Sequence, residues 1–185
     1  MCEADRRRTS HASDTYHRAM SERWKPSVTV AAVIEHDGRF LLVEEDTAEG
    51  LKLNNPAGHL ELAESPEQGV VREALEETAR VFTPQALVGV YLSRFQRPDD
   101  AHGTEDVTYV RFAYAGTVGE ADPARALDSG IVRTLWMTLD EVRASRARHR
   151  SPLVLRCIED YVAGRRYPLD AVTADPSVYA PIPAR

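Results

Sequence analysis

The sequence predicts an α/β domain in which helices cover both faces of a mixed β-sheet. Two observations lead to this fold class. Apolar runs rich in β-branched residues recur along the chain, and strong helix-capping signals stand between them. With 185 residues, the chain is long enough for one domain with a substantial hydrophobic core.

The two ends of the chain differ in composition from its middle. Residues 1–24 are polar and charged without periodicity, which predicts a disordered N-terminal tail. The domain is expected over 25–170, followed by a proline-containing arm or tail over 171–185. Because Met20 stands close to the start of the domain, residues 1–19 are either an over-long start or a tail specific to the species.

The first predicted elements form a β-hairpin. Apolar runs at 28–34 and 40–43 flank Asp37-Gly38, a dipeptide that favours tight hairpin turns. Further strands are expected over 87–93, 107–117 and 131–137.

The best-specified helix begins after Ser65. Ser65 is a good N-cap, Pro66 suits the first helical position, and Gln68 completes a capping box. At about 100° per residue, apolar residues fall on one face of this helix. The opposite face carries three acidic residues, Glu73, Glu76 and Glu77.

Two more helices are expected near the C-terminus. Thr138 and Glu141 form a second capping box, which opens a helix ending in the basic run 143–150. Ser151-Pro152 then caps a last helix that Gly164 ends.

The spacing of the three glutamates has two interpretations. Residues at i, i+3 and i+4 share one helix face, where like charges destabilise the helix by about 0.2–0.5 kcal/mol per pair. A solvated acidic face would explain them as a surface feature. That interpretation does not explain why Gly58, Glu64 and Arg72 stand at fixed positions before the glutamates. Since converging carboxylates suit hard divalent cations, we expect a surface cleft that binds Mg²⁺, with Mn²⁺ as a substitute, for phosphate chemistry.

The composition of the chain limits the classes of molecule that this site is expected to bind. The net charge of −6 argues against nucleic-acid binding through a basic surface. The chain shows neither an apolar run of membrane-spanning length nor a signal peptide, and its two cysteines do not resemble a disulfide framework. We therefore expect a cytoplasmic enzyme, monomeric or homodimeric, that acts on a small molecule and binds neither nucleic acid nor membranes.

The acidic helix and the residues before it carry a resemblance to a known family. A glycine, five residues, Glu, seven residues, Arg-Glu, two residues and Glu-Glu make up the signature of the Nudix hydrolases. The matching residues are Gly58, Glu64, Arg72, Glu73, Glu76 and Glu77, within a box over 58–80. Ala79 and Arg80 depart from the pattern, because a glycine and an aliphatic residue normally stand there. Ala79 suggests that the helix end need not adopt a left-handed cap.

Other segments are similar to the NudJ-type Nudix phosphatases of bacteria. These segments are 28–31, 55–61, 150–154 and 161–169, whereas Leu53 stands where that branch tends to place a tryptophan. Such enzymes release phosphate from nucleoside di- and triphosphates and from the diphosphate of the thiamine pyrimidine precursor. The resemblance implies an α/β/α sandwich with the box as a loop–helix–loop, a topology that sequence pattern alone does not select.

The resemblance also assigns roles to the box residues. Glu73, Glu76 and Glu77 are the expected catalytic and metal-binding residues, with the Gly58 carbonyl as a further metal ligand. Glu64 and Arg72 are expected to form an ion pair that supports the loop. The general base is either Glu73 or an acid outside the box, for which the candidates are Glu105, Asp106 and Glu120.

Substrate-binding residues outside the acidic face are harder to identify. His59 follows the metal-loop glycine, and three arginines are candidates for phosphate contacts: Arg94, Arg97 and Arg111. Each arginine taken singly is better explained as surface charge, and only one of the three is expected to bind substrate. Tyr91 and Phe95 either stack on a base or pack within the sheet, and Trp136 is expected in the core.

Two alternative functions share the same box. A pyrophosphohydrolase of ADP-ribose or of oxidised nucleoside triphosphates would use the same metal chemistry on a different bond. A nucleotide-sensing Nudix module, which is not an enzyme, would be expected to lack a catalytic glutamate or to carry a DNA-binding domain. This chain shows neither feature.

Overall fold

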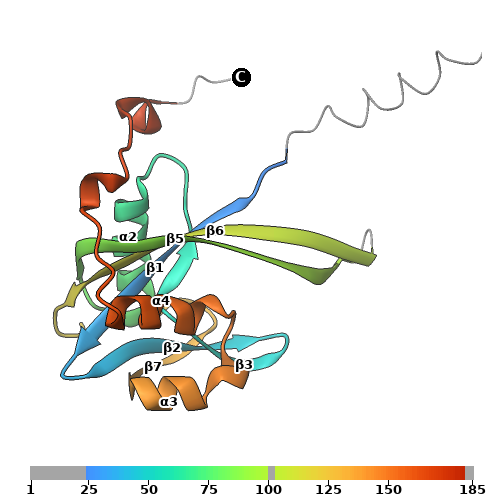
Figure 1. Cartoon of the computed structure of the whole chain (residues 1–185), viewed down its shortest axis with the longest axis vertical. Helices are drawn as coiled ribbons and strands as arrows, with labels where there is room; N and C mark the ends of the chain where they lie inside the picture. The colour runs from blue at the N-terminus through green and yellow to red at the C-terminus, as the bar shows by residue number, and fades with distance from the viewer. Residues whose placement is uncertain (1–23, 100–102, 182–185) are drawn as a thin grey trace, which may run out of the picture.

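The computed structural model describes residues 24–99 and 103–181, and the side chains of 97–99 are not described. Within these residues, seven strands form one sheet with the order β3-β2-β1-β6-β5, while β4 pairs with β1 and β7 pairs with β2 (Figure 1). The pairing of β1 with β6 is parallel and the other pairings are antiparallel, so the sheet is mixed as predicted. Nearly all of the expected tail over 1–24 lies outside the described residues.

The strand bounds confirm the predicted strands and add two. The strands are β1 Ser27–His36, β2 Arg39–Thr47, β3 Gly50–Asn54, β4 Ala57–His59, β5 Phe82–Asp99, β6 Gly103–Val118 and β7 Ile131–Thr138. Asp37 and Gly38 form the turn between β1 and β2, with φ angles of 49° and 75°. Positive φ at both positions is what a type I′ hairpin turn requires. The sequence did not predict β3 and β4, which are short and lack a long apolar run.

The strand β5 is also much longer than expected. It pairs with β6 from Phe82 opposite Val118 to Asp99 opposite Gly103, with register shifts near Pro84 and Gly89. The resulting hairpin extends beyond the rest of the molecule (Figure 1). The bulges absorb residues that interrupt the strand pattern, which explains why the periodicity revealed only its middle part.

The helices cover the two faces of the sheet. Helix α2, Pro66–Thr78, packs through Val70 and Ala74 on one face, together with Val30 and Ile34 of β1. Helices α3, Leu139–Ala144, and α4, Leu153–Val162, pack on the other face, whose core includes Val33 of β1. The expected α/β fold with a mixed sheet between helical layers is therefore confirmed (Figure 1).

Both ends of α2 are defined by hydrogen bonds. Ser65 and Gln68 form the predicted capping box. At the other end, Ala79 has φ 54° and ψ 27°, so the expectation that this cap need not be left-handed is wrong. The Ala79 amide donates to the Leu75 carbonyl and its own carbonyl accepts from the Asp122 amide. This conformation lets the end of α2 bind the loop between β6 and β7 although no glycine is present.

The last helices begin as predicted. Thr138 and Glu141 form the second capping box, but α3 ends at Ala144, so most of the basic run follows the helix. Part of this run forms a 3₁₀ turn, Arg146–Arg148. The Ser151 hydroxyl accepts from the Leu153 amide at the start of α4, and Gly164 follows its end with φ 82°.

The C-terminal segment returns to the loop before α2. It contains two 3₁₀ turns, Leu169–Ala171 and Pro176–Tyr179. Residues 172–180 and the loop 60–66 line a groove of about 490 Å³. This segment therefore lies beside the loop that leads into the acidic helix.

Candidate metal centre

Two elements position the acidic residues, namely α2 and the short strand β4. Glu73 and Glu77 point from α2 toward the sheet and are 8% and 7% exposed, so the expected surface cleft is in fact largely buried at these two carboxylates. The Ala57 amide on β4 donates to the Glu77 carboxylate over 2.8 Å. Because β4 pairs with β1, this hydrogen bond ties the acidic helix directly to the sheet.

Gly58 occupies a position where a side chain has no space. A Cβ atom at residue 58 would collide with the Glu73 carboxylate. The backbone of β4 therefore lies close against the Glu73 carboxylate, and the Gly58 carbonyl and this carboxylate are groups that would hold a cation here. Close approach of the backbone, and not an unusual φ angle, is the reason for a glycine here.

Arg72 connects the loop with the acidic face. Its guanidinium binds Glu64 through two nitrogens, with N–O distances of 3.0 Å and 2.7 Å, and also donates to the His59 carbonyl over 3.0 Å. Its Nη1 donates to Glu73 over 2.8 Å and to Glu76 over 2.9 Å. One side chain thus holds the loop and orients two of the three acids that are proposed to bind metal.

The carboxylates of the cluster repel one another. Burial raises the pKa of Glu77 to about 9, and the charges of Glu45, Glu73 and Asp128 act in the same direction. Burial also raises the pKa of Glu73, although Arg72 opposes this effect. Clustered carboxylates that resist ionisation are the groups that a bound cation would stabilise in their charged form.

The donor set fits a hard divalent cation. It consists of carboxylate oxygens and a carbonyl, which are the ligands that Mg²⁺ prefers. In the described part of the chain, no three acidic, histidine or cysteine side chains converge as a finished metal cage. In this arrangement Nη1 of Arg72 donates to the carboxylates of both Glu73 and Glu76.

Sequence reasoning missed two acids near this cluster. Glu45 lies on β2 and Asp128 lies in the loop before β7, and the charges of both raise the pKa of Glu77. The Asp128 amide also donates to the Glu76 carbonyl over 3.0 Å. No spacing rule links these residues to the box, because only the tertiary fold brings β2 and this loop beside α2.

The three acids predicted as bases outside the box lie elsewhere in the described structure. Glu105 and Asp106 are exposed on β6, where Asp106 pairs with Arg94. Glu120 lies after β6, with its carboxylate 4.0 Å from Arg80. In the described part of the chain, the partners of Asp106 and Glu120 are therefore arginines outside the acidic face of α2.

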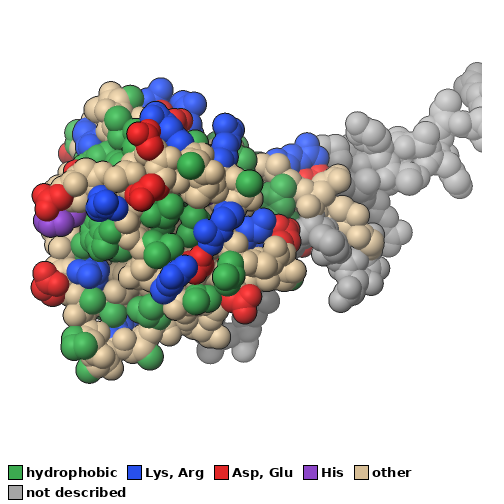
Figure 2. All heavy atoms as spheres, turned by 90° about the horizontal axis from the view of Figure 1, so that it is seen from below, with side chains coloured by type: hydrophobic (Ala, Val, Ile, Leu, Met, Phe, Trp, Pro, Cys, Tyr) green, Lys and Arg blue, Asp and Glu red, His purple; other side chains and the backbone are tan. Residues whose placement is uncertain are grey.

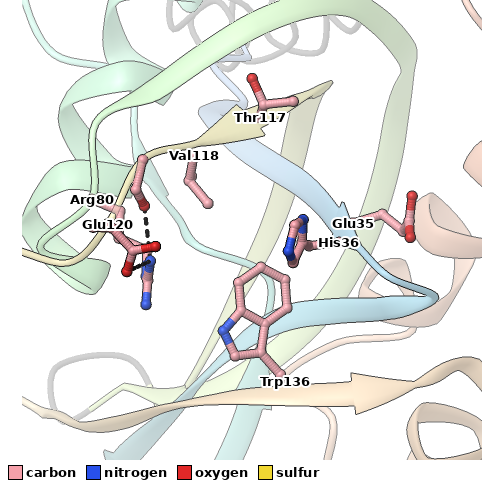
Figure 3. A pocket seen from close by; sticks show the side chains of 8 residues that line it. Glu35, His36, Arg80, Thr117, Val118, Glu120 and Trp136 are labelled. Atoms are coloured by element: carbon pink, nitrogen blue, oxygen red, sulfur yellow. Dashed lines mark hydrogen bonds and ion pairs between the residues drawn. The ribbon is translucent and has the colours of Figure 1, made fainter.

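Glu120 instead borders a separate small hollow (Figure 3). This hollow has a volume of about 110 Å³ and is lined by Arg80 and Trp136 among others. The Arg80 guanidinium lies 6.0 Å from the centre of the Trp136 ring and donates to the Gly119 carbonyl over 2.8 Å. Trp136 is only partly buried and packs against the core on the α2 face.

The predicted substrate-binding residues have different surroundings. His59 is exposed and its ring centre lies 5.7 Å from that of Tyr109, which stacks on Phe95 at 5.5 Å. Arg94 is exposed and pairs with Asp106, whereas the side chain of Arg97 lies outside the described residues. Arg111 is buried, with 8% of its surface exposed.

On one face of the molecule, the acidic and basic side chains do not form separate patches (Figure 2). Figure 2 shows acidic and basic side chains interspersed there, without a broad basic patch. Among the described helices, none is both long and apolar enough to span a membrane.

Comparisons with known proteins agree with the architecture and the box. The NUDIX domain family matches residues 23–157. The chain is 36% identical over 150 residues to Phosphatase NudJ of Escherichia coli (strain K12). The aligned region covers 80% of this chain and 92% of that protein. It is 51% identical to a NUDIX hydrolase from Nitrosomonas europaea with a TM-score of 0.72, over 82% of this chain and 98% of that one.

A more distant structure shares the fold alone. The MutT NUDIX hydrolase from Burkholderia pseudomallei is 23% identical with a TM-score of 0.57, over 74% of this chain and 98% of that one. The family match covers the sheet, the acidic helix and the loop before it, and it confirms the resemblance carried by Gly58 and the residues of the box. This chain belongs to the Nudix hydrolase family and is an enzyme that hydrolyses pyrophosphate bonds.

Proposed function

We propose that this enzyme is a Mg²⁺-dependent phosphatase of nucleoside di- and triphosphates and of related diphosphates, such as the thiamine pyrimidine precursor. The observation that carries the proposal is the position of Glu73, Glu76 and Glu77 on one helix, with the Glu73 carboxylate close against the backbone of Gly58. The 36% identity to Phosphatase NudJ, over 92% of that protein, supports release of phosphate as the outcome.

In the proposed mechanism, the three glutamates and the Gly58 carbonyl hold the cation. A bound Mg²⁺ would supply Lewis acidity and neutralise charge on the phosphate oxygens. Arg72 keeps Glu73 and Glu76 oriented while Glu64 holds Arg72 in place. The chain contributes mainly by positioning the diphosphate and by its preorganised charges.

The attacking water requires a base. Glu73 is one candidate, because burial raises its pKa and so makes its carboxylate a stronger base. Among the acids outside the box, Asp128 is supported most directly, because its charge acts on both Glu73 and Glu77. Glu105, Asp106 and Glu120 remain predictions, and the described partners of Asp106 and Glu120 are Arg94 and Arg80.

Product identification by ³¹P NMR tests the proposed function. The purified enzyme would be incubated with Mg²⁺ and, in parallel, with GTP, GDP or ADP-ribose. Phosphate released from both GTP and GDP is the expected result. Pyrophosphate with GMP from GTP, or AMP from ADP-ribose, would instead assign the enzyme as a pyrophosphohydrolase. Binding of nucleotide without turnover would assign a sensing module.

The cellular setting of the enzyme follows the sequence-based expectations. We propose that it works in the cytoplasm on small-molecule substrates, as a monomer or a homodimer. Size-exclusion chromatography with light scattering would distinguish these two states.

A further inference from the structure

Arg111 is a buried cation that the proposed mechanism does not use. It lies on β6, opposite Thr29 of β1 and Tyr91 of β5. The residue is 8% exposed, and its Nη1 is buried without a hydrogen-bond partner. Throughout residues 24–99 and 103–181, its side chain makes neither a hydrogen bond nor an ion pair.

An unpaired buried guanidinium is energetically unfavourable. Arginine remains charged in proteins, and a buried charge is normally paired or hydrogen-bonded, because burial otherwise removes its hydration without replacement. Burial lowers the pKa of Arg111, while the charges of Glu45 and Glu77 oppose this change without reaching ion-pair distance. The structure therefore retains a cation whose anion is not supplied by the described part of the chain.

A second polar group without a partner lies next to Arg111. Thr29 is 6% exposed, and its hydroxyl is buried without a hydrogen bond. Because register partners on neighbouring strands point to the same face, Thr29 and Arg111 present their side chains together. Tyr91 shares this row, but its hydroxyl already donates to Asp160. Arg111 and Thr29 are thus two adjacent donors that a bound anion could satisfy.

This row lies beside the metal centre but on the other face of the sheet. Ala113, two residues after Arg111, belongs to the core on the α4 face. His59 is the register partner of Thr29 and follows Gly58, whose Cα faces the Glu73 carboxylate closely. Successive residues of a strand point to opposite faces of the sheet. At the end of β4, Gly58 therefore faces the acid cluster, whereas His59 faces the Arg111 row, so only this strand lies between the two groups.

We propose that Arg111 and Thr29 form an anion subsite that binds a phosphate group of the substrate beside the metal centre. The identity of the ligand as a phosphate rests on the proposed function. Arg111 would donate to phosphate oxygens from its buried end, and the Thr29 hydroxyl would donate alongside it. Tyr109, two residues before Arg111, lies on the same face and contacts His59 and Phe95, so aromatic rings lie beside the proposed subsite.

The test measures binding of a simple anion without metal or turnover. Metal-free protein in EDTA would be titrated with inorganic phosphate, and separately with pyrophosphate, by calorimetry and by thermal shift. We expect Arg111→Met to weaken binding at least tenfold and Arg111→Lys to retain part of the affinity. Thr29→Val, which removes only the hydroxyl, should weaken binding by a smaller factor.

The stability of the variant without ligand separates a binding role from a structural one. If Arg111 lacks a partner in the free protein, Arg111→Met should unfold at the same temperature as the wild type or higher, and phosphate should no longer raise that temperature. Arg143→Met is the matched control, because Arg143 makes only surface ion pairs with Asp140 and Glu159. The control should bind phosphate as the wild type does.

Two results would overturn the proposal. One is wild-type affinity for phosphate in Arg111→Met. The other is a marked fall in unfolding temperature for both Arg111→Met and Arg111→Lys, with unchanged phosphate binding in the lysine variant. Failure of the proposed function would give a different result. Nucleotides would then release no phosphate, although phosphate binding would still depend on Arg111.

Discussion

Glu77 places a carboxylate in a buried position that favours its neutral form. Burial and the neighbouring acids raise its pKa to about 9, while the Ala57 amide donates to it. A glutamine at this position can accept the same hydrogen bond but cannot contribute a negative charge. Ionising Glu77 is therefore unfavourable in the free protein, and a bound cation would offset that cost.

Glu77→Gln is expected to lower kcat about 100-fold or more while leaving the unfolding temperature equal or higher in EDTA. The loss of activity follows from the loss of an anionic metal ligand. The gain in stability follows because the folded protein keeps the buried Glu77 in its neutral form, whereas the unfolded chain ionises this residue freely at neutral pH. Steady-state kinetics and calorimetry would measure the two effects. Near-normal activity with Mg²⁺ would show that the metal site is assigned to the wrong residues.

Gly58→Ala tests the close approach of β4 to the acidic helix. The added methyl group would displace the Glu73 carboxylate, which is the end of a flexible side chain. We expect stability to fall by less than about 1 kcal/mol, whereas kcat/KM should fall between about tenfold and 100-fold, because small displacements of catalytic groups are costly. Equal activity of the variant and the wild type would contradict the proposed geometry.

The candidate site residues that the sequence predicts are those that share a local spacing. Glu73, Glu76 and Glu77 lie on one helix, so their common face follows from helical periodicity, and Gly58 lies on β4 shortly before that helix. Asp128 could not be found in this way, because a hydrogen bond from its amide to the Glu76 carbonyl places it there. The burial of Arg111 was equally hidden, since an arginine within a strand pattern reads as surface charge.

The end of helix α2 shows how an element can tolerate an unfavourable residue. Ala79 adopts left-handed backbone angles, which cost an L-residue with a side chain about 1–2 kcal/mol. Glycine at this position would remove that strain but would also remove a buried methyl group, a loss of about 0.8 kcal/mol. The strain is the larger of the two contributions.

Ala79→Gly is therefore expected to stabilise the protein by about 0.5 kcal/mol. For a chain of this size, the unfolding temperature should rise by about 1–2 °C. Differential scanning calorimetry would measure the shift, with Ala63→Gly as a comparison at another alanine of positive φ, 64°, which is exposed. A lower unfolding temperature for Ala79→Gly would mean that the methyl group contributes more than the strain.

The connection between loop and helix depends on Arg72. Arg72→Ala removes every hydrogen bond from this guanidinium to Glu64, Glu73 and Glu76, so both stability and activity should fall. The expected loss is about 2 kcal/mol, because hydrogen bonds between charged groups are among the stronger ones. A purely kinetic effect would contradict the supporting role.

Arg72→Ala should also change how the free energy of unfolding depends on pH in acid. Arg72 lowers the pKa of Glu64, so this pair stabilises the folded state above the unfolded pKa of about 4.5 and loses its effect as the pH falls through the folded value. The difference in stability between wild type and Arg72→Ala should therefore shrink below pH 4.5. Chemical denaturation at several pH values would measure it, and a difference independent of pH would count against the Glu64 contact.

The elements found from the sequence are those with strong local signals. Capping boxes at Ser65 and Thr138 and the Asp37-Gly38 turn gave correct starts because each depends on neighbouring residues. The strands β3 and β4 and the full length of β5 were not found. Their existence depends on pairing with β2, β1 and β6, which periodicity in one segment does not report.

At the scale of the whole molecule, the sheet brings two kinds of charge to its opposite faces. The α2 face carries repelling carboxylates, whereas the α4 face carries the unpaired Arg111. Both groups lower the stability of the free protein. A metal-bound phosphate ester would supply a cation to the carboxylates and an anion to Arg111. The arrangement is that of a protein whose stability is lower without its ligands.

Mg²⁺ should consequently stabilise the folded protein even without substrate. A ligand at 100 times its dissociation constant stabilises the state that binds it by about 2.7 kcal/mol. For a chain of 185 residues, this corresponds to a rise in unfolding temperature of about 5–10 °C. The experiment compares calorimetric scans in EDTA with scans over a series of Mg²⁺ concentrations. Glu73→Gln combined with Glu77→Gln should abolish the rise, whereas Glu67→Gln, in the first turn of the same helix, should retain it. An equal rise in all three proteins would place the cation away from the acidic face of α2.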